Sequence, residues 1–404
     1  MVGQPGRRTT LRQVAERAGV SMGTASAVFS GRAAVSTASR HAVERAASAL
    51  GYRPALRRTT VQPTDDTAVP GVRSIGLVIR LMEHSLRTNP FYSSVLEGAQ
   101  GVCATLGLSL SYELVVGIDR HDPLPLSVQR REAHGLLLVG YLPDHTVDQI
   151  TATGVPCVLV DNGVSLGSTH SLGGAHSPGG THSLGGVRGA RAATLDAVRN
   201  DDERGGYLAV RHLLDLGHTD PVPAMIAGPA EFPSISDRLR GYRRAIVDAG
   251  YTVDPELIRT TTLSPTGGRA QMAELLDLPT PPTAVFCCND ATALGALATL
   301  RERGISVPED ISVVGYDDIE LAGQAAPPLT TVRVDKELMG AQSVWHLLQR
   351  IRRPAMSGRE TLLEVSLVVR DSTAPPRHHS LNHPHHHTHP RPPDGRPEPP
   401  SREP

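Results

Sequence analysis

Apolar residues near the N-terminus recur at the three- and four-residue spacing of amphipathic helices. Thr10 and Gln13 have the spacing of a capping box before the first such stretch, and Gly19 is suited to end it. A second helix is predicted after a cap at Ser21, and a third after a cap at Ser36. Three short helices with one small shared core are therefore expected, with these inward-facing residues: Leu11, Val14, Ala15, Ala18, Ala25, Val28, Phe29, Val43, Ala46, Ala47 and Leu50.

From Ser74 onward the pattern changes to short apolar runs that alternate with helical stretches. This alternation is typical of a parallel α/β architecture. Helices are predicted at residues 92–106 and 291–303. The clearest predicted strands are residues 75–79, 135–140, 156–161, 223–228, 283–288 and 311–318.

Charge is distributed unevenly along the 404 residues, although the net charge is only −1. The first 60 residues contain ten arginines and two acids, so the remainder of the chain is acidic. A small basic domain on an acidic body favours a polyanionic partner such as nucleic acid.

No apolar run approaches the roughly 18 residues that span a bilayer, and the basic N-terminus lacks the apolar region of a signal peptide. The four cysteines have no metal-ligand spacing and are expected to be buried, reduced thiols. These features predict a cytoplasmic protein without a membrane partner, a metal site or a cofactor.

The stretch TLRQVAERAGVSMGTASAVFSGRAAVSTASRHAVERAASALGYRP resembles the DNA-binding head of the lactose/galactose repressor (LacI) family along its whole length. The resemblance implies an all-α helix-turn-helix head, here residues 1–54, whose second helix enters the major groove. The positions that match the family pattern are Thr10, Leu11, Val14, Ala15, Ala18, Gly19, Val20, Ser21, Thr24, Ser26, Val28, Gly31, Val35, Ser36, Gly51, Tyr52 and Pro54.

At the positions where the family reads base edges, this chain has Met22, Gly23 and Ala27. Met22 and Ala27 can touch thymine methyl groups but cannot form a bidentate contact with guanine. DNA binding with unusual, relaxed sequence readout is expected, and a head that no longer binds specifically is the alternative. The residues expected to contact phosphates are Thr10, Ser21, Thr24, Ser26, Ser36 and Tyr52.

In the family, a hinge after the head folds on DNA and inserts a leucine into the minor groove. Val61 occupies that position here, and Thr59, Thr60 and Val61 are poor helix formers. Residues 55–72 are predicted to be a hinge and linker in which Arg57 and Arg58 reach phosphates. Whether Val61 acts as a wedge stays open at this point.

Residues 73–373 resemble the effector-binding and dimerisation domain of the same family. The resemblance implies a body like a periplasmic binding protein, with two Rossmann-like subdomains and three crossings of the chain between them. Residues 169–186 contain three glycine- and histidine-containing repeats, so a flexible insertion is expected near 163–190. Residues 374–404 are predicted to be a disordered tail rich in histidine and proline. No leucine heptad follows the body, so a dimer is expected.

Four polar residues lie at, or just beyond, ends of predicted body strands or in a family motif: Asp161, Arg238, Asn289 and Asp317. Ligands of open α/β sheets bind at the carboxyl ends of strands. Together with Phe91 or Tyr92, which could stack on a ring, these residues are predicted to bind an effector, a sugar or sugar derivative. The alternatives are a helix cap at Asn289, a surface ion pair at Arg238, and core or dimer contacts at the two aromatic residues.

The sequence thus predicts a DNA-binding transcriptional repressor controlled by a small-molecule effector, bound as a dimer to a roughly palindromic double-stranded operator. A soluble sugar-binding protein is the main alternative. The pattern GVSLG at residues 163–167 matches the nucleophile elbow of serine hydrolases, but a glycine repeat follows it where a hydrolase has a helix. An enzyme is therefore not expected.

Overall fold

The computed structural model describes residues 10–30, parts of 36–47, and residues 69–81, 90–116, 124–163 and 195–377. Among these residues, no helix is long and apolar enough to cross a membrane. The predictions at Tyr52, Arg57, Arg58, Val61 and the side chain of Ala27 lie outside the described part, as do most of the hinge, the repeat and the tail.

The head begins with two helices, α1 (Leu11–Ala18) and α2 (Met22–Ser30). The predicted capping box is present, because Thr10 and Gln13 cap each other's backbone, and Gly19 ends α1 with a φ of 66°. The oxygen Oγ of Ser36 accepts a hydrogen bond from the backbone N–H of Ser39 at 3.2 Å, as expected for the third cap. The head core contains Val14, Ala15, Ala25, Val28, Val43, Ala46 and Ala47, all buried.

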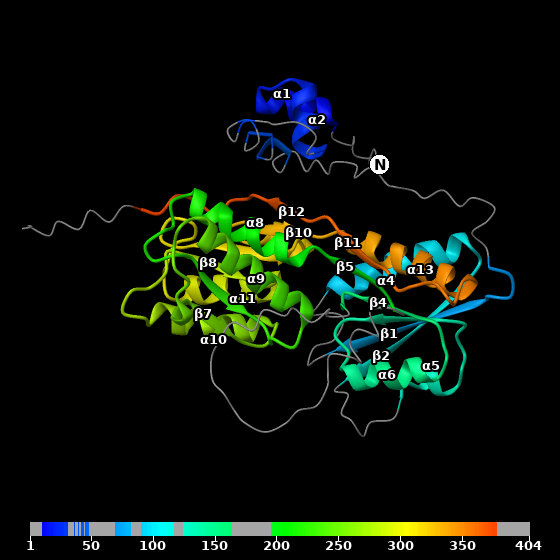
Figure 1. The fold of residues 1–404 in the computed structure, drawn as a ribbon. Helices are drawn as coiled ribbons and strands as arrows, with labels where there is room; N and C mark the ends of the chain where they lie inside the picture. Colours follow the sequence, from blue (N-terminus) through cyan, green and yellow to red (C-terminus); the bar gives the residue numbers. More distant parts are fainter. Residues whose placement is uncertain are drawn as a thin grey trace, which may run out of the picture.

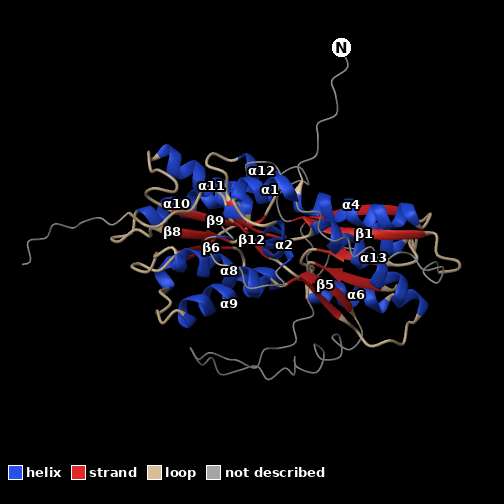
Figure 2. Cartoon of the chain, turned by 90° about the horizontal axis from the view of Figure 1, so that it is seen from above, coloured by secondary structure: helices blue, strands red, loops and turns tan. Residues whose placement is uncertain are grey.

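The body contains two six-stranded sheets, each lying between helices (Figure 2). The first sheet has the order β11-β5-β4-β3-β1-β2 and is entirely parallel. Its strands are β1 (Ser74–Leu81), β2 (Ser109–Val116), β3 (Leu136–Val139), β4 (Cys157–Val160), β5 (Asp196–Asn200) and β11 (Glu360–Leu363). Its helices are α4 (Pro90–Thr105), α5 (Leu126–Gln129), α6 (Asp144–Ala152) and α13 (Lys336–Arg352).

The second sheet has the order β12-β10-β9-β8-β6-β7 and is parallel except for the β12–β10 pair. Its strands are β6 (Ala224–Ala227), β7 (Ile258–Thr260), β8 (Ala284–Cys287), β9 (Ser312–Asp317), β10 (Thr330–Arg333) and β12 (Ser366–Val368). Its helices are α8 (Asp202–Asp215), α9 (Pro233–Asp248), α10 (Pro265–Leu276), α11 (Asp290–Glu302) and α12 (Glu320–Gln324), with a 3-10 turn at Pro255–Leu257.

The chain passes between the two subdomains three times: after β5, after β10 and after β11 (Figure 1). The second passage returns α13 to the first sheet, where it packs on α4. This confirms the predicted pair of Rossmann-like subdomains and the three crossings. All four cysteines are buried and free, as expected.

Residues just after the predicted boundary at residue 373 contact the second subdomain. Ala374 forms hydrogen bonds with Ser312 at 3.0 Å, and its carbonyl lies 2.9 Å from Nε2 of the buried His218. Arg377 forms an ion pair with Asp310 at 3.0 Å. The side chains of the second subdomain therefore hold residues up to Arg377 in place.

Glycines set the distance between α4 and α13. A Cβ added to Gly98 would lie 1.9 Å from the carbonyl oxygen of Glu337, and one on Gly340 would lie 1.9 Å from that of Val95. Side chains at these two positions would force the helix backbones apart. The close crossing fastens the returning helix α13 to the first sheet.

We expect Gly98→Ala to lower the free energy of unfolding by about 1–3 kcal/mol, because the new methyl group overlaps backbone that cannot move aside cheaply. Gly101 is the matched control on the same helix, since a Cβ there would meet nothing within 4 Å. Gly101→Ala should leave stability unchanged or raise it by about 0.5–1 kcal/mol, because alanine favours the helix. Thermal melts of both variants test the crossing, and equal melting temperatures would contradict it.

Candidate functional site

The second helix of the head has one buried and one exposed face. Ala25 is 0% exposed and Val28 is 7% exposed, whereas Met22 is 54% exposed. Gly23 and Ser26 are also exposed. The helix therefore packs on α1 with its apolar side and presents the predicted base-reading positions Met22 and Gly23 to solvent.

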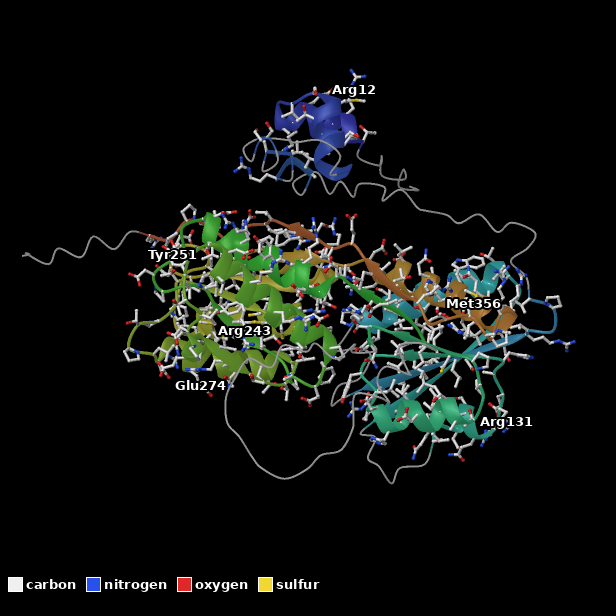
Figure 3. All side chains as sticks on the ribbon, viewed as in Figure 1. Arg12, Arg131, Arg243, Tyr251, Glu274 and Met356 are labelled. Carbon is white, nitrogen blue, oxygen red and sulfur yellow. The ribbon has the colours of Figure 1, made fainter. Side chains whose placement is uncertain are left out.

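The predicted phosphate contacts Thr10 and Ser21 lie at helix N-termini. The Ser21 Oγ accepts a hydrogen bond from the backbone N–H of Thr24 at 3.0 Å and also contacts the Thr24 hydroxyl at 2.9 Å. Helix N-termini attract anions because their first N–H groups lack intrahelical partners. On the neighbouring surface, Figure 3 shows Arg12 projecting from α1, where it pairs with Glu16 at 2.9 Å.

In the body, two acidic residues predicted to bind an effector lie at the carboxyl ends of strands in different sheets. Asp161 follows β4, and Asp317 is the last residue of β9. Their φ angles are 54° and 107°, and that of the next residue, Asp318, is 51°. Positive φ angles are uncommon for residues other than glycine and cluster at functional sites. Both strand ends are therefore candidates for a binding site.

Arg238 and Tyr92 lie near these two carboxyl groups, and we call the four residues the intersheet site. Arg238 Nη2 lies 3.6 Å from Asp317 Oδ1. Tyr92 on α4 is close enough to Asp161 and Asp317 for both to raise the pKa of its hydroxyl, although burial is the larger cause. The tyrosine hydroxyl therefore stays protonated and can donate a hydrogen bond.

The carboxyl groups of the intersheet site are difficult to ionise. Burial raises the pKa of Asp317 to about 6, and Arg238 and Lys336 only partly offset it. Burial also raises the pKa of Asp161 well above its usual range, and the nearby carboxylates of Asp202 and Asp317 add to the shift. Among the described residues, the buried oxygen Oδ1 of Asp161 has no hydrogen-bond partner. This oxygen is therefore available to accept a hydrogen bond from a ligand.

Arg238 is buried and its donors are directed into the protein. Nε donates to Asp202 at 2.8 Å, and Nη1 donates to the carbonyl of Cys288 at 2.6 Å. The guanidinium carbon lies 3.6 Å from the centre of the Tyr316 ring. Arg238 is not the plain surface ion pair considered above. In this geometry it orients Asp317 and Asp202.

Two other predicted residues lie in structural positions. Asn289 is the N-cap of α11, because its Oδ1 accepts a hydrogen bond from Thr292 N at 2.8 Å. Phe91 is 4% exposed and belongs to the hydrophobic core, where its ring meets that of Tyr92 edge-on with centroids 5.2 Å apart. The observed contacts therefore match the alternative interpretations: Asn289 is a helix cap and Phe91 is a core residue.

Sequence reasoning missed three residues near this site. Asp202 accepts the hydrogen bond from Arg238, and the rings of Tyr141 and Phe232 have centroids 5.0 Å apart. Arg199 forms ion pairs with Asp237 and Glu360. Tyr141 and Asp202 follow the carboxyl ends of β3 and β5, so the strand-end rule could have found them. Ser165 of the GVSLG pattern lies outside the described residues. The described residues contain no group of three His, Cys, Asp or Glu side chains able to hold a metal ion.

Comparison with known proteins assigns both parts of the chain. Residues 10–55 match the model of bacterial regulatory proteins, lacI family, and residues 210–373 match a periplasmic binding protein-like domain. The HTH-type transcriptional regulator CelR of Thermobifida fusca is 34% identical over 372 residues, which cover 91% of this chain and 98% of CelR.

Two solved structures are similar over nearly the whole chain. A CelR–cellobiose complex has 31% identity and a TM-score of 0.61, with 90% of this chain and 100% of the other covered. A lac repressor dimer bound to operator and the anti-inducer ONPF has 28% identity and a TM-score of 0.60, with 91% and 100% covered. The similarity thus extends over head and body together.

Proposed function

This chain belongs to the lacI family of bacterial regulatory proteins, and from that premise we propose that it is a repressor controlled by a sugar bound at the intersheet site. It is a transcriptional regulator that binds operator DNA as a dimer. The repressing direction, the ligand class, the residues that contact ligand and DNA, and the cytoplasmic location are the proposed parts. A catalytic role is not proposed.

The buried, unpartnered oxygen Oδ1 of Asp161 at the end of β4 is the observation that carries the effector assignment. This oxygen can accept a hydrogen bond from a sugar hydroxyl whether or not the carboxyl group carries a proton. Because the carboxylates of Asp202 and Asp317 already lie 2.8 Å and 3.6 Å from Arg238, its charge offers little to an anionic group. We therefore propose an uncharged sugar instead of a phosphorylated or acidic one, with cellobiose as the first compound to test because CelR binds it.

The proposed dimer surface includes the edge strand β2. Tyr112 is 56% exposed and Leu114 is 41% exposed, and both lie on this strand. Exposed apolar side chains on a sheet edge favour association with another chain. A second copy placed there would present two heads to the two half-sites of an operator.

A soluble sugar-binding protein without a DNA target would have no use for the head. The head has a closed core and capped helices, and its exposed face includes Met22, Gly23 and Ser26. These features favour a working DNA-binding domain over a degenerate one. Selecting operator sequences from a random DNA pool with the full chain, then titrating cellobiose against the complex, tests both halves of the proposal.

Operator binding should depend strongly on salt, because the ten arginines of the first 60 residues displace counterions from DNA. Raising salt from roughly 50 to 200 mM is expected to weaken binding by on the order of a hundredfold or more. Fluorescence anisotropy with a labelled selected operator measures the effect, and non-specific DNA of equal length is the control. A flat salt response would show that the basic head is not the binding module.

A further inference from the structure

Arg199 joins the two subdomains through a pair of short ion pairs. It lies on β5 of the first sheet, and its Nη1 is 2.6 Å from Asp237 Oδ2 on α9 of the second subdomain. Its Nε is 2.6 Å from Glu360 Oε1 on β11, the neighbouring strand of its own sheet. The side chains of Arg199 and Asp237 are only 20% and 9% exposed, so solvent screens their pairing weakly.

The carboxylates of Glu360 and Asp237 stabilise the protonated, charged form of Arg199. Burial lowers the pKa of its guanidinium, but Glu360 and Asp237 together raise it above its ordinary value. Removing the arginine would leave acidic groups facing each other across the boundary. Breaking a buried pair by removing one partner is costly for this reason.

Each partner of the Arg199–Asp237 pair also has a second partner within its own subdomain. Glu360 stays beside Arg199 because both lie on paired strands, and Arg240 Nη2 lies 2.6 Å from Asp237 Oδ1 on the same helix. Separation of the subdomains would therefore break one ion pair but leave neither charge alone. This arrangement makes the contact reversible, whereas an isolated buried pair would act as a permanent tie.

The contact is close to both the crossings and the intersheet site. Arg199 and Glu360 lie on the strands that precede the first and third crossings, β5 and β11. Asp237 immediately precedes Arg238, which orients Asp317, and Arg199 is also near enough to Asp161 to influence its pKa. A change in this contact would thus alter how the two halves of the site face each other.

We propose that the Arg199–Asp237 ion pair is a latch that holds the two subdomains in their ligand-enclosing orientation, with Arg240 keeping Asp237 paired when the latch opens. Arg199 is a positioning residue under this proposal and touches no ligand. The latch sets the balance between closed and open subdomains before any effector binds. It goes beyond the proposed repressor function, and its orientation readout needs neither operator nor sugar.

Distance measurements between spin labels test the latch directly. The pair Gln149→Cys on α6 and Ala270→Cys on α10 places one exposed label in each subdomain. The four native cysteines are buried and are not expected to compete for the label. Pulsed electron paramagnetic resonance on the full-length protein, without effector or DNA, then reports the closed and open populations.

Asp237→Asn should shift the population toward the longer label distance, with the open-to-closed ratio rising about tenfold or more, as expected for loss of a charge-assisted bond. Arg199→Gln should do the same, and combining both changes should add little more. Arg240→Gln should act in the opposite direction, because an open form would then leave Asp237 unpaired.

Arg244→Gln is the matched control on α9. Arg244 shares Glu203 with Arg240, at 3.5 Å and 3.3 Å respectively, but makes no contact with Asp237. It should leave the distance distribution unchanged. The proposal is overturned if Asp237→Asn leaves the distances unchanged, or if Arg240→Gln shifts them in the same direction as Asp237→Asn. Failure of operator or sugar binding would bear on the proposed function alone.

Discussion

Replacing Asp317 by asparagine is expected to weaken effector binding by about 10- to 150-fold, the range for a lost hydrogen bond to a charged group of about 1.5–3 kcal/mol. Operator binding without effector should persist, because Asp317 belongs to the intersheet site and not to the head. Effector titrations of the operator complex, followed by fluorescence anisotropy, measure both properties. Asp161→Asn should likewise weaken effector binding and leave operator binding intact.

The same Asp317→Asn change is expected to stabilise the fold. The unfolded carboxyl group titrates near its ordinary value of 3.8, whereas burial raises the folded pKa to about 6. Between these two pKa values the folded protein binds more protons than the unfolded chain, so its stability falls as the pH rises from 3.8 to about 6. At pH 8 the variant should gain about 1–3 kcal/mol, and the gain should shrink as pH falls below 6.

Asp248→Asn is the control, since Asp248 is 46% exposed and lies 3.6 Å from Arg244 at the surface. It should change neither the effector midpoint nor the pH dependence of the melting temperature. A normal effector response in Asp317→Asn would remove this residue from the ligand site. A loss of stability at pH 8 would contradict the burial argument.

Ala25→Asp is expected to abolish sequence-specific DNA binding, with a loss of on the order of a thousandfold or more relative to wild type. Ala25 is 0% exposed in a head core of small side chains. Burying a carboxylate there costs several kcal/mol, and a domain this small has little stability to lose. The arginines remain, so weak salt-dependent binding to any DNA should survive.

The body should be unaffected by this change, because its cores do not include head residues. Its main thermal transition and its effector binding should match wild type in calorimetry. Ala270→Asp on the exposed face of α10 serves as the control for an added carboxylate and should retain operator binding. If Ala25→Asp binds its operator normally, the DNA-binding surface lies elsewhere.

Several elements of the body were predictable because their residues carry a local pattern. The predicted strand at 311–318 corresponds to β9 (Ser312–Asp317), and the predicted helix at 291–303 to α11 (Asp290–Glu302). Strand β5 (Asp196–Asn200) was not among the clear predictions, since Asp196, Arg199 and Asn200 interrupt its apolar pattern. Asp196 is nonetheless fully buried, because Arg350 of α13 neutralises it at 3.0 Å.

Local patterns in the sequence were sufficient to predict the head, the alternating body and the strand-end residues Asp161 and Asp317. Caps, helical periodicity and strand ends are encoded by residues a few positions apart, so the pattern can be found without a fold. Only the folded chain shows that Arg238 points inward to Asp202 and that Arg199 meets Asp237 and Glu360. Asp202 lies 36 positions from Arg238 in the same subdomain, whereas Asp237 and Glu360 lie 38 and 161 positions from Arg199 and meet it because the chain crosses between the subdomains.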